Sequence, residues 1–208
     1  MTENDRQTEE KIFDAATVVF EEKGMDGARM QDIADTAGIN KALLHYYFRT
    51  KERLFDAVFQ KVAGKMFSKF APLFQEDMTL EEKIRFFYRE HITFLQENRK
   101  LPAFVLNEIN RNPAIIKKML KNVELDKIWR TLTEQNQKEL EKYDIREEDI
   151  PQILTSIISL SVFPFAARGV LESLLENVGT TFDDYIEARK EFAAEFILSA
   201  LRGRKINK

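Results

Sequence analysis

The side chains that most often perform covalent or metal chemistry are scarce in this chain. Its 208 residues include two histidines, His45 and His91, and no cysteine. The lack of cysteine excludes disulfides, thiolate metal sites and a cysteine nucleophile, and two histidines so far apart poorly supply a metal site or a nucleophile–base pair. The sequence also contains no glycine-rich phosphate loop. We therefore expect no catalytic residue, no bound metal and no cofactor, and we predict that the protein is not an enzyme.

A short segment near the N-terminus suits a different chemistry. Between Lys41 and Lys51 the chain reads KALLHYYFRTK, with basic and tyrosine side chains in succession, although the formal net charge of the protein is -3. Lysine ammonium groups and tyrosine hydroxyl groups donate hydrogen bonds to phosphate oxygens. The segment therefore indicates DNA binding, although the tyrosines could be ordinary packing aromatics and Lys51 could belong to a solvated face.

Two short predicted helices position this segment. We expect one helix over residues 30–37, ended by Gly38, and a second over residues 41–48, which Asn40 can cap. Two short helices on either side of a tight turn form the helix-turn-helix arrangement, whose second helix enters the DNA major groove.

Helical spacing sorts the residues of the second helix. Leu44 and Phe48 lie four residues apart, so they share one face and should pack on the first two helices. Residues at the N-terminal end of such a helix approach the base edges. The expected base-facing residues are Lys41, Ala42, Leu43 and Tyr46. The expected phosphate contacts are His45, Tyr47 and Lys51, and Gln31 of the preceding helix completes the predicted DNA-binding set.

The rest of the chain is also predicted to be helical. Hydrophobic residues make up 44% of the chain and charged residues 32%, with only 7 glycines and 5 prolines. We find no strand pattern, and apolar residues recur at helical spacing. Further helices are expected over residues 8–23 with Gly24 as its end, from a cap at Thr50, from a capping box formed by Thr79 and Glu82, and from Pro102 and Pro113. The last helices are expected over residues 123–143, over residues 150–177 with a kink at Pro164, and over residues 181–202.

The sequence contains no obvious targeting segment. The N-terminus MTENDRQTEEK is acidic and polar, which does not fit a secretory signal. The most apolar run, from Ser156 to Ala167, has about a dozen residues and is too short to cross a bilayer. We therefore expect a cytoplasmic protein with no membrane partner.

The stretch from Met30 to Phe55 resembles the TetR family of bacterial transcriptional regulators. The matching residues are Ile33-Ala34, Ala37-Gly38, Tyr47-Phe48 and Lys51-Glu52-Arg53-Leu54. The chain departs from the family pattern at four places: Asn40 stands where serine is usual, Ala42 where glycine is common, His45 where tyrosine is common, and Ala28 near the expected position of a threonine cap for the helix over residues 30–37.

The resemblance implies an all-α fold with two parts. A three-helix DNA-binding domain would occupy residues 1–50, and a helical domain for ligand binding and dimerisation would occupy residues 51–208. In the family the last two helices usually form the dimer interface. The resemblance therefore implies a homodimer that binds a palindromic operator in double-stranded DNA.

The family also implies a small-molecule effector of unknown identity. By position, the plausible ligand-binding residues are Tyr88, His91, Phe104, Asn107, Trp129 and Phe163. An apolar cavity with a few polar groups would suit a small apolar or aromatic ligand that releases a repressor from its operator. His91 could instead be a satisfied, half-buried histidine. Arg168 could pair with a buried acid, contact an anionic ligand or reach solvent.

An alternative without a ligand stays open. In that alternative, the chain is a DNA-binding protein whose operation needs no small molecule, or a helical interaction module.

Overall fold

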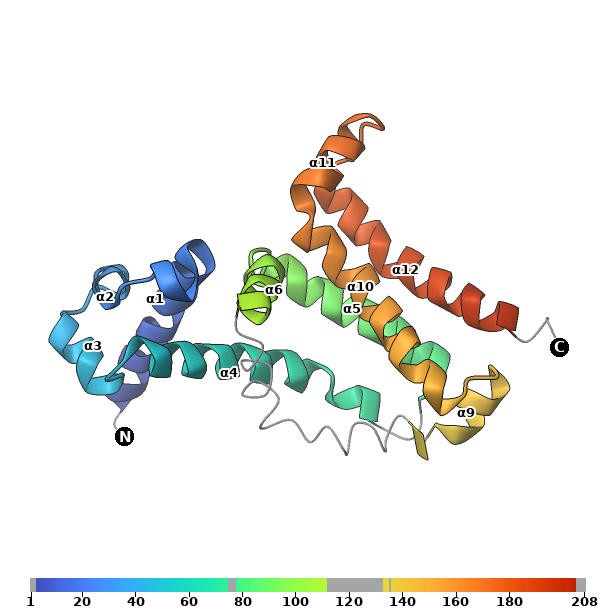
Figure 1. The fold of residues 1–208 in the computed structure, drawn as a ribbon, viewed down its shortest axis with the longest axis horizontal. Coiled ribbons are helices and arrows are strands. Elements are labelled where there is room, and N and C mark those ends of the chain that lie inside the picture. Colours follow the sequence, from blue (N-terminus) through green and yellow to red (C-terminus); the bar gives the residue numbers. More distant parts are fainter. Residues whose placement is uncertain (1–2, 75–77, 112–132, 135, 205–208) are drawn as a thin grey trace. The chain divides into compact units, whose positions relative to one another are not determined.

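All regular elements in the described part of the chain are helices (Figure 1). The computed structural model describes residues 3–74, 78–111, 133–134 and 136–204. These residues form two compact units, which we describe separately. The first contains the described residues up to Lys65 together with Phe104 to Arg111, and the second contains the others. The predicted all-α class is confirmed, while the domain division predicted between residues 50 and 51 stays a prediction.

The first unit is built around the N-terminal helices. Its elements are α1 (Glu3–Gly27), α2 (Met30–Ala37), α3 (Lys41–Tyr47), most of α4 (Lys51–Lys69) and most of α6 (Leu101–Arg111). Fully buried aliphatic side chains from four helices meet in its core, namely Ile12, Ile33, Leu44 and Leu54. The Phe20 ring packs edge-on against Phe55 with centroids 5.0 Å apart, which joins α1 to α4. The predicted helix-turn-helix is therefore held on a continuous apolar core.

The predicted helix caps in this unit are present. Gly38 ends α2 in the left-handed conformation at φ 67°, and Ile39 N–H donates to the Ala34 carbonyl at 3.0 Å. The Asn40 side chain accepts from Leu43 N–H at 2.7 Å. Thr50 accepts from Arg53 N–H at 3.2 Å, which caps α4. These local bonds fix the start and end of both short helices.

The first helix differs from its prediction. It begins at Glu3 rather than at residue 8, and helical residues continue to Gly27. Gly24 nevertheless interrupts it, because its φ of 66° and ψ of 175° are not helical. A residue with a side chain rarely adopts this backbone conformation, so the glycine permits the break.

The second unit contains the remaining helices. They are α5 (Leu80–Glu97), α9 (Gln137–Lys142), α10 (Ile150–Ala166), α11 (Arg168–Glu176) and α12 (Phe182–Arg204), with short 3-10 turns at Ala71–Phe74 and Glu147–Asp149. The predicted capping box at Thr79 and Glu82 opens α5. Its fully buried side chains include Tyr88, Ile92, Ile186 and Leu198, from α5 and α12. The guanidinium of Arg85 on α5 also pairs with Glu191 and Glu195 on α12.

The helix predicted over residues 150–177 is two helices. The break lies at Ala167, whose φ of -109° and ψ of 31° separate α10 from α11, and not at Pro164. Pro164 lies buried inside α10 and lacks the N–H that would bond to the Leu160 carbonyl. Arg189 of α12 supplies a replacement, because its Nε donates to that carbonyl at 3.2 Å. The helix therefore continues past the proline without an unpaired carbonyl.

Two further predictions need comment. Of the helix predicted over residues 123–143, the described part contains α9, and the helix start predicted at Pro113 lies outside the described residues. The apolar run is longer than predicted. The segment Glu147–Ala166 has the length and hydropathy of a membrane-spanning helix, and 28% of its most apolar stretch is buried. Core helices of soluble proteins can meet the same criteria, so the composition alone does not indicate a membrane.

Candidate functional site

The recognition helix α3 presents most of its predicted DNA-binding residues to solvent. Leu44 is fully buried. Phe48 packs edge-on against Phe13 of α1, with ring centroids 5.5 Å apart. The side that faces away from this core contains the exposed residues Lys41, Ala42, His45 and Tyr46, and the partly exposed Leu43 and Tyr47. Tyr46 is 80% exposed, so it is not an ordinary packing aromatic. The predicted separation of core and outward-facing residues on α3 therefore agrees with the structure, while their contacts with DNA stay a prediction.

The hydroxyl of Tyr47 has a protein partner. It donates to Asp5 Oδ1 of α1 at 3.0 Å. Desolvation first, and then the Asp5 carboxylate, raise the pKa of Tyr47 above its ordinary value, so the hydroxyl keeps its proton. A DNA phosphate would have to take the place of Asp5 to accept this hydrogen bond.

Lys51 also has protein partners. Its Nζ donates to the carbonyls of Asp26 at 3.3 Å and Ala28 at 2.9 Å, between α1 and α2. An ammonium group has three N–H donors, so one remains for a phosphate. Its predicted phosphate contact stays a prediction, but Lys51 is not simply part of a solvated face.

Gln31 and His45 make only local bonds among the described residues. The Gln31 amide donates to Asp35 at 2.8 Å on the exposed side of α2. His45 Nδ1 lies 3.3 Å from the Arg49 carbonyl, which requires a proton on that nitrogen. Both side chains are exposed at the surface that α3 also occupies.

In the second unit, two predicted ligand residues lie on one face of α5. Tyr88 and His91 are three positions apart, and both are buried. Ser161 of α10 donates to the Ile158 carbonyl at 2.8 Å, and its oxygen lies 2.9 Å from His91 Nδ1. Since the Ser161 hydroxyl already donates its proton to the Ile158 carbonyl, His91 Nδ1–H must donate to the Ser161 oxygen, and Nε2 of the imidazole carries the lone pair.

Both groups are uncharged at neutral pH. Burial lowers the pKa of His91 to about 4 and raises the pKa of Tyr88 well above its ordinary value. The Tyr88 hydroxyl has no hydrogen-bond partner among the described residues. The rings of Phe70 and Phe87 also pack against the imidazole, with centroids 5.7 Å and 4.9 Å away. The pair thus offers one donor and one acceptor in apolar surroundings.

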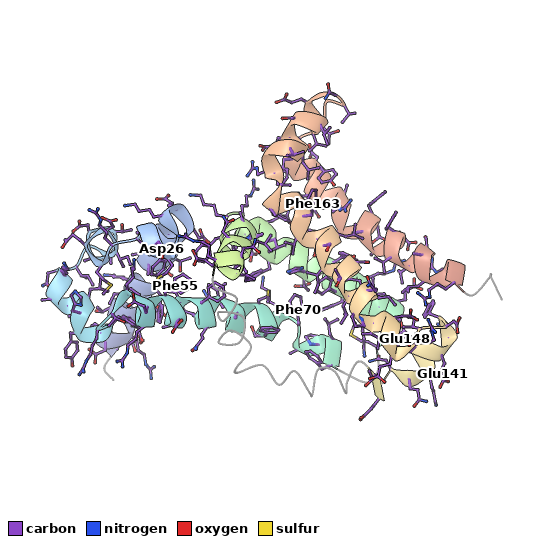
Figure 2. All side chains as sticks on the ribbon, viewed as in Figure 1. Asp26, Phe55, Phe70, Glu141, Glu148 and Phe163 are labelled. Atoms are coloured by element: carbon purple, nitrogen blue, oxygen red, sulfur yellow. The ribbon has the colours of Figure 1, made fainter. Side chains whose placement is uncertain are left out.

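The other predicted ligand residues are placed elsewhere. Phe104 packs in the first unit against Phe55 and Phe59, at 5.8 Å and 6.1 Å between ring centroids, and Asn107 of the same helix is exposed. Phe163, labelled in Figure 2, is 59% exposed on α10. Trp129 lies outside the described residues. Within the described residues, the structure therefore brings together only Tyr88 and His91 of the predicted set.

Some relevant residues were not predicted. Ser161 could have been found as a polar residue inside the apolar run, and Asp5 gives no sequence signal that links it to Tyr47. Of the alternatives for Arg168, the structure shows pairing with an acid, but that acid is exposed and not buried, and contact with an anionic ligand stays a prediction. Arg168 Nε donates to Glu172 on the same helix at 2.8 Å, and its guanidinium stacks on Phe182 at 4.6 Å.

Comparison with known proteins agrees with this arrangement. Residues 12–58 match the model of a family described as bacterial regulatory proteins, tetR family. The probable HTH-type transcriptional regulator YttP of Bacillus subtilis is 23% identical over 173 residues, 81% of this chain and 82% of that protein. The negative transcriptional regulator IcaR of the Staphylococcus aureus biofilm operon icaADBC is 43% identical over 47 residues, 23% of this chain and 25% of IcaR.

A solved structure extends the likeness over most of the chain. The transcriptional regulator FadR of Bacillus subtilis, in complex with stearoyl-CoA, has a TM-score of 0.66 at 20% identity and covers 91% of this chain and 97% of its own. This comparison shows the fold. The helix-turn-helix geometry, the match of residues 12–58 to that family model and the regulator relatives together show that the chain is a DNA-binding transcriptional regulator, not an enzyme, and that its helix-turn-helix region is of the tetR type.

Proposed function

We propose that the protein is a cytoplasmic repressor that binds a palindromic operator as a homodimer and is released by a small apolar ligand. The observation that carries the proposal is the exposed face of α3, held by the Leu44 core contact and the Asn40 cap. The name of IcaR as a negative regulator supports repression. In this proposal Lys41, Ala42, Leu43 and Tyr46 approach base edges, while Gln31, His45, Tyr47 and Lys51 contact the DNA backbone.

Dimerisation is proposed through the second unit. α10, α11 and α12 and the turn after α11 expose large apolar side chains, namely Ile158, Phe163, Val170, Leu174, Val178, Phe192 and Phe196. Two of them, Phe192 and Phe196, stack with ring centroids 6.2 Å apart, and exposed apolar side chains of this size often mark a protein–protein contact. The same two-fold arrangement would place two copies of α3 on two half-sites of the operator.

The effector is proposed to meet the Tyr88–His91 pair. Neither group is charged, so neither can compensate a buried charge on a ligand. The tyrosine hydroxyl can donate to a carbonyl oxygen, and His91 Nε2 can accept from a hydroxyl or amide. The stearoyl-CoA bound by the similar FadR carries a long apolar chain and a thioester carbonyl. A fatty acyl thioester therefore fits the pair better than a free carboxylate does.

The first experiment is selection of duplexes from a random pool by the purified protein at physiological salt. A palindromic consensus is expected, and its half-site spacing would report the distance between the two recognition helices. No enrichment, both before and after the protein is unfolded, washed and refolded, would contradict DNA binding by α3. The refolding step removes any ligand that was carried through purification.

The effector is tested separately by thermal shift. Stearoyl-CoA and stearate share the acyl chain, and free coenzyme A is the control for the nucleotide and phosphate groups that stearate lacks. We expect stabilisation by stearoyl-CoA and weakening of operator binding, with a much smaller effect of stearate. If no compound in a broad apolar set stabilises the protein, the alternative of a DNA-binding protein without an effector is favoured.

A further inference from the structure

The break in α1 leaves a backbone donor that must find a partner. At Gly24 the backbone leaves the helical conformation, and a new turn begins with Met25. Ala28 N–H donates to the Gly24 carbonyl at 3.2 Å, which closes this turn. The first N–H groups of any helical turn lack a partner within the turn, so Met25 N–H needs an acceptor from outside.

Glu108 of α6 supplies that acceptor. Its Oε1 accepts from Met25 N–H at 3.1 Å, although the two residues are 83 positions apart in the sequence. The Glu108 side chain is only 5% exposed. A carboxylate at the N-terminal end of a turn acts as a cap and also interacts favourably with the partial positive charge there. Here the cap comes from a distant helix and not from the preceding residue.

A second pair of side chains joins the same two helices. Arg111, one turn after Glu108, forms an ion pair with Asp26, which is labelled in Figure 2. An added Cβ at Gly24 would lie 3.3 Å from Glu108 Oε1 and 3.6 Å from Arg111 Nη1, which shows how closely α6 approaches the break. α6 therefore contacts two successive residues of the turn.

The turn is held from α4 as well. Lys51 donates to the carbonyls of Asp26 and Ala28. Residues 25–28 lead from the break at Gly24 in α1 towards the start of α2 at Met30, so we call them the α1–α2 connector. Its position determines where α2 begins, and α2 and the Gly38 turn in turn determine the position of α3. The helix-turn-helix is therefore positioned by two helices outside it.

We propose that Glu108 is a positioning residue for DNA recognition, which sets the α1–α2 connector and couples α6 to the helix-turn-helix. α6 follows α5, the helix of Tyr88 and His91, after residues 98–100. A ligand that shifts α5 and α6 would then change the hold of Glu108 on the connector, provided that it has different affinity for the two arrangements. This coupling rests on the proposed function, whereas the hold on the connector does not.

Three variants test the role of Glu108. Glu108→Ala removes the acceptor, Glu108→Gln keeps a carbonyl oxygen for Met25 N–H, and Asn110→Ala is a matched control at an exposed position of the same helix. Hydrogen exchange is measured on the full chain without DNA. We expect Glu108→Ala to accelerate exchange in residues 25–37 by about tenfold. Glu108→Gln should restore most of the protection, and Asn110→Ala should leave it unchanged.

DNA-binding specificity distinguishes a positioning role of Glu108 from a purely structural role, which would leave the specificity unchanged. The ratio of affinities for the selected operator and for a scrambled duplex is compared among the variants. We expect Glu108→Ala to lower this ratio by about tenfold, because a displaced α3 loses base contacts more than phosphate contacts. The conservative Glu108→Gln should recover the ratio.

The outcomes separate the two proposals. If the wild-type protein selects no operator, the proposed function fails, while the exchange measurement still decides whether Glu108 holds the connector. If the operator is selected but Glu108→Ala keeps both the wild-type exchange and the wild-type affinity ratio, Glu108 is not a positioning residue. If exchange accelerates but the ratio is unchanged, its role is structural and the coupling is overturned.

Discussion

Two tyrosine hydroxyl groups in this protein have opposite surroundings. Tyr47 lies at the surface and donates to Asp5, whereas Tyr88 is fully buried and has no partner among the described residues. A buried hydroxyl without a partner costs about 1–3 kcal/mol relative to a paired one. The first hydroxyl can exchange an acidic partner for a phosphate, and the second is ready to donate to a ligand. Each residue therefore leads to a prediction of its own.

We expect Tyr47→Phe and Asp5→Asn to change DNA affinity in opposite directions. Tyr47→Phe removes a phosphate donor, so it should weaken binding to operator and scrambled duplexes alike by about three- to tenfold. Asp5→Asn removes a negative charge beside the hydroxyl and should strengthen both. Fluorescence anisotropy with both duplexes at fixed salt measures the effects. Weaker binding by Asp5→Asn would show that Asp5 orients Tyr47 for DNA and does not compete with it.

His91 predicts a specific dependence of stability on pH. Burial lowers its pKa to about 4 in the folded protein, below the ordinary value of 6.5. As the pH falls through 6.5 the unfolded chain gains a proton that the folded chain does not, so stability decreases until the pH reaches about 4. The contribution is of the order of 3 kcal/mol. Urea unfolding at pH 7 and pH 5 should show a smaller loss in His91→Gln than in wild type, and equal losses would refute the assignment.

At the scale of the elements, Pro164 and Arg189 form a compensating pair. The proline removes the N–H that would serve the Leu160 carbonyl, and the arginine Nε serves it instead. Arg189→Leu should therefore destabilise the protein by about 1–2 kcal/mol. In Pro164→Ala the helix can bond to this carbonyl itself, so Arg189→Leu should cost less in that background. Urea unfolding of wild type, both single variants and the double variant, all at one protomer concentration, measures these free energies. If the two single effects simply add in the double variant, Arg189 does not compensate for Pro164.

Whether an element was predictable depended on how local its determinants are. The Gly38 turn, the Asn40 cap and the Thr79 capping box arise from residues within a few positions of one another, and the sequence predicts them correctly. The sequence places this break at Pro164 and not at Ala167. The bond that keeps α10 intact at the proline comes from Arg189 of α12, 29 positions after Leu160. No periodicity in the sequence indicates such a bond.

The same distinction applies to the candidate sites. On α3 the spacing of Leu44 and Phe48 determines which side chains face outward, so the exposed set could be predicted. The contacts of His91 with Ser161 and of Glu108 with Met25 join residues 70 and 83 positions apart. They depend on how the helices pack. The positions assigned to a ligand by family likeness alone, such as Phe104 and Phe163, are accordingly found in different surroundings.

At the scale of the whole molecule, the exposed apolar side chains of α10, α11 and α12 predict the association on which the proposed operator binding depends. Phe163 and Phe196 are 59% and 57% exposed, on α10 and α12. Substitution of either by Asp places a charge where the proposed dimer buries an apolar ring, so we expect sedimentation at micromolar concentration to show monomers. Each monomer keeps an intact α3 but reaches only one half-site. Affinity for a palindromic operator should therefore fall by at least about a hundredfold, while affinity for a single half-site changes little.

A control residue in the first unit separates dimer loss from added charge. Val18 of α1 is also an exposed apolar residue, at 47%, but it lies in the first unit, outside the proposed dimer face. Val18→Asp adds the same charge and should leave the sedimentation of the dimer unchanged. If Phe163→Asp and Phe196→Asp stay dimeric at low concentration and keep operator affinity, the two-fold contact must use another surface. The exposed phenylalanines would then need a different partner.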